Sequence, residues 1–189
     1  MTTIIAFKSK LGSILCADTQ GNIGNRSVNV PKIFPIEPRV VAGISGPLFI
    51  LQAIQDILSE GDVPSLETAS QVYSVVNSWN GELEDFYGVD FEKDANGLTL
   101  LPYQMFIATE NDIFRVLSNG EVISFNEANL EYDSIGSGSS YALGSLYSTQ
   151  DTPDIESRMR TAMSAAAAFD SATGREILIY QVYENATSH

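Results

Sequence analysis

The sequence has almost no histidine and almost no cysteine. The single histidine, His189, is the last of the 189 residues, and Cys16 is the single cysteine. One histidine at the end of the chain excludes catalysis by Ser-His-Asp or Cys-His groups and any metal site built on several histidines. One cysteine excludes an internal disulfide, and its apolar surroundings predict a buried, unreactive thiol. A hydrolase built on this chain must therefore find its general base elsewhere.

Positive charge and long apolar runs are also scarce. The chain has 10 Lys and Arg against 24 Asp and Glu, which gives a formal net charge of -14. Such a chain is repelled by nucleic acid and by anionic membranes. No apolar run is long enough to span a bilayer, and the start lacks the basic and apolar stretches of a secretory signal. A cytoplasmic location is therefore expected.

Motifs for nucleotide binding and signs of internal division are missing as well. No Gly-Lys-Ser/Thr motif follows the glycine-rich stretch at 136–140, so any ATP-driven step would belong to a separate protein. No internal repeat or linker is visible, and the length fits a single domain over residues 1–189.

Hydrophobic periodicity and turn signals predict alternating strands and helices. Strands are predicted at 3–8, 13–18, 40–46, 103–109, 112–117, 121–125, 131–135 and 177–183, with two short extended pieces around Pro31. Helices are predicted between Pro47 and Gly61, from Ser65 to Trp79, over 141–147, and from Pro153 to near Asp170. The polar residues 19–26 are interpreted as a loop, and 82–96 as a loop or a frayed helix end. This order fits two sheets with helices outside them, a layered α+β architecture.

The first residues suggest one source for the missing base. The chain begins Met1-Thr2-Thr3, so removal of the methionine would make Thr2 the terminal residue. The α-amine of a terminal threonine can accept the proton of its own hydroxyl and so activate that hydroxyl as a nucleophile. The unperturbed pKa of that amine is about 8, so a useful fraction is neutral at physiological pH. Taken alone, the two threonines are better explained as the start of an edge strand, where β-branched residues fit well.

Several other short segments also have ordinary explanations when each is taken alone. Asp18 could end a strand at a turn, and Lys32 could be a surface lysine. Together and in this order, six segments resemble one family, the proteasome β-type subunits of the N-terminal nucleophile hydrolase superfamily. The segments are 2–8, 16–18, 30–33, 41–46, 135–139 and 170–174. The resemblance covers nearly the whole chain and implies a four-layer αββα sandwich.

The resemblance also implies roles for individual residues. Thr2 corresponds to the nucleophile, Lys32 to the buried lysine that lowers the pKa of its hydroxyl, and Asp18 to the carboxylate that holds this lysine charged. The backbone N–H of Gly46 corresponds to the oxyanion donor, at a place where a side chain would obstruct the scissile carbonyl. The residues implied to position the amine and the catalytic water are Ser137, Asp170 and Thr173. The implied reaction is acyl transfer to Thr2 followed by hydrolysis of the ester.

Substrate binding follows from the same correspondence. The pocket for the residue before the cut would be lined by Val30, Phe34, Ile44 and Leu48, although Phe34 is large enough to fill part of it. Gly21 and Asn22 would lie in a stretch that pairs with an extended peptide. The expected substrate is a peptide or an unfolded protein, with a hydrophobic side chain before the cut. Neither a metal nor a cofactor is expected. Family members close into homo-oligomeric rings, and any ATP-dependent unfoldase would be a separate partner.

Some features depart from the family pattern and keep alternatives open. The loop between Asp18 and Lys32 is shorter than usual, which makes the geometry of that pair less certain, and Gln20 stands where most proteasome β subunits have arginine. No propeptide precedes Thr2, only Met1, and a retained methionine would leave Thr2 without a free amine. The leading hypothesis is a threonine endopeptidase in a self-compartmentalised oligomer, because every catalytic position is filled. The alternatives are a catalytically silent structural β-type subunit and an N-terminal nucleophile amidase acting on small amides.

Overall fold

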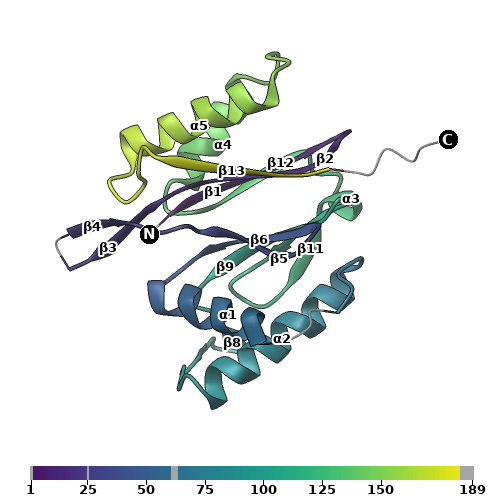
Figure 1. Cartoon of the computed structure of the whole chain (residues 1–189), viewed down its shortest axis with the longest axis vertical. Helices are drawn as coiled ribbons and strands as arrows, with labels where there is room; N and C mark the ends of the chain where they lie inside the picture. Colours follow the sequence, from purple (N-terminus) through teal and green to yellow (C-terminus); the bar gives the residue numbers. More distant parts are fainter. Residues whose placement is uncertain (1, 25, 61–63, 184–189) are drawn as a thin grey trace.

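The computed structural model describes residues 2–24, 26–60 and 64–183, and its centre is a pair of facing antiparallel sheets (Figure 1). The first sheet has four strands in the order β12 (Tyr132–Gly136), β1 (Thr3–Ser9), β2 (Gly12–Asp18) and β13 (Ile177–Tyr183). The second has five strands in the order β11 (Val122–Ser124), β10 (Ile113–Val116), β9 (Gln104–Ala108), β6 (Val40–Ser45) and β5 (Ile33–Glu37). The N-terminal strand β1 thus lies inside its sheet, between two neighbours.

Helices cover the outer face of each sheet. The first sheet is covered by α4 (Ser139–Ser148) and α5 (Ile155–Phe169), and the second by α1 (Leu48–Glu60) and α2 (Ala69–Asp85) (Figure 1). A short helix, α3 (Phe125–Ala128), links β11 to β12. The predicted four-layer αββα sandwich is confirmed. Over the described residues, none of the helices combines the length and apolarity that a membrane crossing requires.

Successive side chains of a strand point to opposite faces of its sheet, and this explains how the chain fills three apolar layers. In β1, Ile4 packs between the two sheets with Phe106, whereas Ile5 packs against α5 with Met159. A continuous apolar run therefore suits a strand that is buried on both sides. The third layer, between the second sheet and its helices, is centred on residues such as Trp79.

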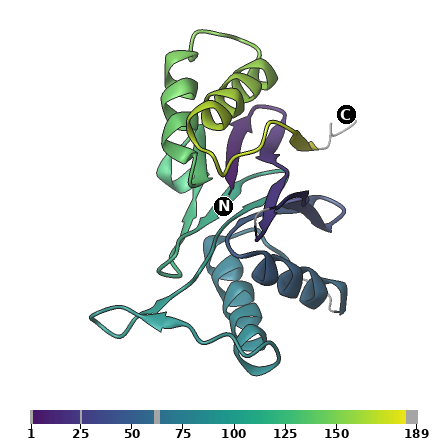
Figure 2. The ribbon, with the colours of Figure 1, turned by 90° about the vertical axis from the view of Figure 1, so that its left-hand side faces the viewer.

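Two predicted segments are corrected by the structure, and one short helix was not predicted. The predicted loop 19–26 is largely a two-stranded hairpin of β3 (Gln20–Ile23) and β4 (Arg26–Asn29). The segment 82–96 contains the end of α2 and then β7 (Glu92–Lys93), which pairs with β8 (Thr99–Leu100) in a hairpin that projects from the sandwich (Figure 2). The short helix α3 has too few residues to show a helical period in the sequence.

The starts of three helices also differ from the prediction. Helix α5 begins at Ile155, after its N-cap Asp154, and not at Pro153. The N-cap of α2 is Thr68, not Ser65, because Thr68 and Gln71 form a reciprocal capping box. The Thr68 hydroxyl accepts the Gln71 N–H at 3.3 Å, and the Gln71 side chain accepts the Thr68 N–H at 3.0 Å. Helix α4 begins at Ser139, two residues before the predicted Tyr141.

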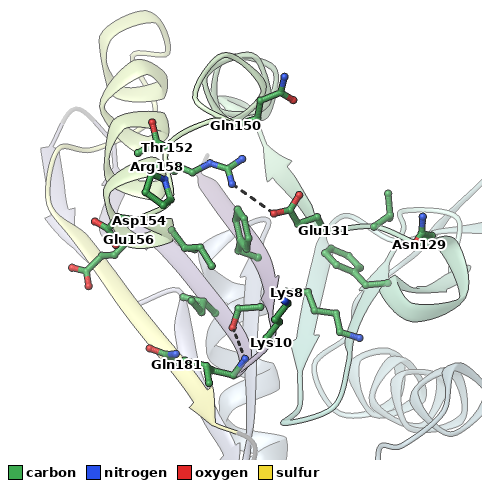
Figure 3. Close-up of a pocket in the computed structure, with 18 of the residues that line it drawn as sticks. Lys8, Lys10, Asn129, Glu131, Gln150, Thr152, Asp154, Glu156, Arg158 and Gln181 are labelled. Atoms are coloured by element: carbon green, nitrogen blue, oxygen red, sulfur yellow. Dashed lines mark hydrogen bonds and ion pairs between the residues drawn. The ribbon is translucent and has the colours of Figure 1, made fainter.

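A broad cleft of about 1380 Å³ lies at one end of the sandwich, beside the β1–β2 turn and the start of α5 (Figure 3). The buried Arg158 guanidinium lies over the Phe7 ring, 3.6 Å from a Glu131 carboxylate oxygen. The charged residues of the lining balance, with Lys8, Lys10 and Arg158 against Glu131, Asp154 and Glu156. None of the predicted site residues lines this cleft.

Candidate active site

The Asp18 carboxylate, at the end of β2, is fully buried and receives four hydrogen bonds. The Thr3 N–H donates to Oδ1 at 2.9 Å. The Oδ2 atom accepts from the Gln20 N–H at 3.0 Å, the Gly174 N–H at 3.0 Å and the Lys32 ammonium at 2.9 Å. A buried carboxylate is tolerated only when its oxygens are satisfied in this way. Asp18 therefore ties together four separate parts of the chain.

Lys32 is 4% exposed and forms the ion pair with Asp18. Its backbone carbonyl accepts the Ile44 N–H at 3.0 Å, which fixes the segment before β5 against β6. Burial lowers the pKa of the Lys32 ammonium, while the charge and hydrogen bond of Asp18 act in the opposite direction. The predicted pairing of Asp18 with Lys32 is present despite the short intervening loop. The Gln20 substitution does not disturb it, because Gln20 supports Asp18 through its backbone N–H.

A second carboxylate, Asp170, caps the end of α5 and faces the start of α4. Its Oδ2 accepts the Ser137 hydroxyl at 2.6 Å and the Thr173 hydroxyl at 2.7 Å, and its Oδ1 accepts the Ala172 N–H at 3.1 Å. Partial burial raises the pKa of Asp170, but these three donors more than offset that effect, so the pKa lies below its usual value. The three residues predicted to position the amine and water are thus in direct contact.

Two glycines let the N-terminal threonines approach this second group. Gly136 pairs with Thr3 across β1 and β12 and has a φ of +96°, and a Cβ there would lie 1.9 Å from the Thr2 carbonyl oxygen. A Cβ on Gly138 would lie 2.2 Å from Thr3 Oγ1 and 2.8 Å from Thr173 Oγ1. Both positions therefore require glycine.

A cavity of about 570 Å³ opens beside Thr2 and Lys32. It is lined by four of the seven residues predicted to be catalytic, Thr2, Lys32, Gly46 and Ser137, while Asp18, Asp170 and Thr173 lie behind the lining. Five of the six predicted substrate-binding residues also line it, namely Gly21, Asn22, Val30, Ile44 and Leu48. The structure therefore gathers residues from six distant segments around Thr2.

Phe34 is the exception, and the prediction that it lines the pocket is wrong. Phe34 is 9% exposed and packs in the apolar layer under α1 and α2. Its partner across β5 and β6 is Ala42, so it lies two residues farther along the sheet than Ile44. The Phe34 ring consequently contributes to the core.

Sequence reasoning missed some residues of the lining. Leu51 follows Leu48 by three residues on α1, so helical spacing could have identified it. Pro102 comes from the segment before β9, and no signal in the sequence links it to the site.

The reason for a glycine at position 46 also differs from the prediction. A Cβ on Gly46 would lie 2.7 Å from the Tyr103 Cβ and 3.2 Å from the Pro102 carbonyl oxygen. Close packing against this segment therefore already requires glycine, before any effect on a substrate carbonyl is considered.

The two halves of the buried ion pair are expected to respond differently to mutation. Asp18→Asn should destabilise the fold by about 3–5 kcal/mol, because it leaves Lys32 without its counter-charge and points an amide donor at existing donors. Lys32→Met should cost less than half as much, because the three backbone N–H groups still satisfy Asp18 and a desolvated ammonium is removed. Urea unfolding of both variants measures the difference, and equal losses would contradict this account.

The glycine next to the threonines allows a matched comparison. Gly138→Ala should destabilise the fold by about 1–3 kcal/mol, because the added Cβ overlaps the Thr3 and Thr173 hydroxyls. Gly144→Ala is the control, since nothing lies within 4 Å of its Cβ position on α4. Alanine there should stabilise the helix by about 0.5–1 kcal/mol. Thermal melting that moves both variants in the same direction would refute the overlap.

No family model matches the chain, but curated proteins and solved structures are similar to it. The chain is 26% identical over 194 residues to the proteasome subunit beta of Saccharomonospora viridis, covering 96% of this chain and 66% of that protein. It therefore spans slightly less than two thirds of the length of the curated relatives it matches.

Two solved structures have the same fold. BPH from Thiobacillus denitrificans, in complex with epoxomicin, has a TM-score of 0.82 at 23% identity, covering 96% of this chain and all of that one. Eukaryotic HslV from Trypanosoma brucei has a TM-score of 0.66 at 18% identity, covering 96% and 99%. The chain therefore has the N-terminal nucleophile hydrolase fold and is similar to proteasome β subunits along nearly its whole length.

Proposed function

We propose that the chain is a threonine-type endopeptidase whose nucleophile is the hydroxyl of Thr2 after removal of Met1. The observation that carries the proposal is that Thr2 and Lys32 line one cavity while Asp18 holds Lys32 at 2.9 Å. A nearby ammonium favours the ionised form of the hydroxyl, and the α-amine of Thr2 supplies the base. The similarity to proteasome β subunits supports the same chemistry.

The proposed reaction has two steps. The Thr2 oxygen forms a bond to the scissile carbonyl carbon, its proton passes to the α-amine, and the amine delivers it to the leaving nitrogen as the C–N bond breaks. Water then attacks the resulting ester, the carboxylic acid leaves, and the Thr2 hydroxyl is restored. The Gly46 N–H is the proposed oxyanion donor, while Ser137, Asp170 and Thr173 are proposed to position the amine and the water.

Peptides are the substrate class that the cavity favours. Its lining includes the apolar side chains of Val30, Ile44, Leu48 and Leu51, together with the β3 residues Gly21 and Asn22. A strand beside an apolar pocket suits an extended peptide with a hydrophobic residue before the cut. A small amide would leave this strand unused, so the amidase alternative is less favoured.

Assembly is also part of the proposal. We infer a homo-oligomeric ring in the cytoplasm that acts on peptides or unfolded proteins, with any ATP-dependent unfoldase a separate chain. The silent-subunit alternative is disfavoured by the filled site, in which Lys32, Asp18, Ser137, Asp170 and Thr173 make the contacts described above.

Removal of the Thr2 hydroxyl tests the proposal directly. Thr2→Ala should lower the rate of peptide hydrolysis by about 10³-fold or more, because no nucleophile remains. The control is Thr161→Ala, which removes an exposed hydroxyl on α5 and should keep wild-type activity. Intact mass after an epoxyketone or β-lactone probe should reveal one adduct on wild type and none on Thr2→Ala. Full activity in Thr2→Ala would end the proposal, and a wild type that keeps Met1 and takes no adduct would favour the silent subunit.

The apolar side chains in the lining predict a substrate preference. Peptides with leucine or phenylalanine before the cut should be hydrolysed with a kcat/KM about 10-fold or more above matched peptides with aspartate or arginine, because a charged group loses its hydration in this pocket. Fluorogenic peptides that differ only at that position measure the ratio. A preference for either charged residue would contradict the assignment of the pocket.

A further inference from the structure

Thr3, the residue next to the proposed nucleophile, contacts both carboxylates of the site, one directly and one through a hydroxyl. Its N–H donates to Asp18 Oδ1 at 2.9 Å. Its side-chain oxygen lies 2.6 Å from Thr173 Oγ1, and Thr173 in turn donates to Asp170. Thr3 is fully buried and does not line the cavity beside Thr2. Its polar groups are therefore directed at the supporting residues and not at a substrate.

The direction of these hydrogen bonds follows from counting protons. A hydroxyl has one proton to donate, and an ionised carboxylate can only accept. Because Thr173 donates its proton to Asp170 Oδ2 at 2.7 Å, it can only accept from Thr3. The chain of donors therefore runs from the Thr3 hydroxyl through Thr173 to Asp170, where it meets the Ser137 hydroxyl.

The surrounding backbone leaves room for this oxygen. The missing Cβ of Gly138 would lie 2.2 Å from Thr3 Oγ1, so the space that a side chain would occupy is filled by the Thr3 hydroxyl. The pairing of Thr3 with Gly136 fixes the register of β1 against β12, and with it the position of Thr3. The oxygen is thus held by strand pairing as well as by its hydrogen bond.

We propose that Thr3 is a positioning residue that sets the two halves of the site relative to Thr2. Its N–H orients Asp18, and through it Lys32, while its hydroxyl orients Thr173 and Asp170, and through them Ser137. The inference rests on the proposed function, because positioning has a catalytic meaning only if Thr2 reacts. It differs from a packing role, because it depends on the hydroxyl and not on the methyl group.

The hydroxyl also contributes to the charge state of Asp170. Donors in a chain polarise one another, so the Thr3 proton strengthens the hydrogen bond that Thr173 gives to the carboxylate. The other groups acting on this carboxylate are the Ser137 hydroxyl, the Ala172 N–H and, through their charges, the N-terminal amine and Lys32. Loss of the Thr3 hydroxyl should therefore raise the pKa of Asp170 while these groups stay in place.

The test compares Thr3→Ala with Thr3→Ser, because both lack the methyl group and only serine keeps the hydroxyl. In the Met1-free chain, Thr3→Ala should lower kcat for a hydrophobic peptide by about 10- to 100-fold, with KM within about twofold of wild type. Thr3→Ser should restore most of the lost kcat. The carboxyl ¹³C titration of Asp170, assigned with Asp170→Asn, should move to higher pH in Thr3→Ala and remain near wild type in Thr3→Ser.

A second variant breaks the same series of hydrogen bonds at Thr173. Thr173→Ala should also lower kcat, and adding Thr3→Ala to it should cost little more, because residues that act through one another are not additive. Circular dichroism melting identifies any variant that has lost the fold. If Thr3→Ala has lost it, the comparison of Thr3→Ser with wild type decides whether the hydroxyl has the proposed role.

The outcomes separate this inference from the proposed function. Wild-type kcat in Thr3→Ala, an unchanged Asp170 titration, or equal losses in the alanine and serine variants would overturn the inference while leaving a Thr2 peptidase intact. A Met1-free wild type without peptidase activity would overturn the proposed function and the catalytic meaning of Thr3 with it. The titration would then still reveal whether the donor chain exists.

Discussion

The buried carboxylate of Asp18 is the constraint on which the rest of the site depends. With no exposure to water, its charge is stabilised by an ammonium and by three backbone N–H groups that surround it. These donors come from β1, the start of β3, the segment before β5, and the turn after α5. Four segments must therefore be in place before the carboxylate is satisfied, and their placement puts Lys32 and Thr2 on the same cavity. Three of the donors belong to the backbone, and a Cβ on Gly174 would lie 2.6 Å from the Gln20 Cβ, so the close approach of the Gly174 N–H to the carboxylate requires glycine.

Rigid placement of the N-terminus follows from the sheet. Strand β1 is paired on both sides, to β2 and to β12, so Thr3 is held at the first step of a central strand and Thr2 directly precedes it. Sites supported by paired strands keep their geometry better than sites on loops. Gly136 and Gly138 then allow the backbone beside Asp170 to approach the two threonines. The position of Thr2 is thereby set by the fold.

Strong local patterns made much of this predictable, and tertiary packing decided the rest. The long apolar strands and the six family segments were sufficient to identify the sandwich and most of the residues around Thr2. The β3–β4 hairpin was missed because its polar, glycine-containing sequence also suits a loop. Ser65 and Thr68 are both acceptable N-caps, and only the Gln71 side chain selects between them. The position of Phe34 depends on the register of β5 against β6, and the need for glycine at position 46 depends on Tyr103, so neither could be read from its own segment.

The charges within the site and the net charge of the whole molecule have opposite effects on the ionisation of a hydroxyl in the cavity. A net charge of -14 opposes the ionisation of any hydroxyl, but exposed acidic groups are screened beyond about 8 Å at physiological salt. Lys32 is buried, so its field on the cavity is screened much less, and the charge and hydrogen bond of Asp18 favour the ammonium form of Lys32 against the effect of burial on its pKa. The nearby cation therefore outweighs the distant anions. The same reasoning shows how the proposed nucleophilic chemistry is compatible with an acidic chain that has one histidine, since the charge that matters is the one buried beside the cavity.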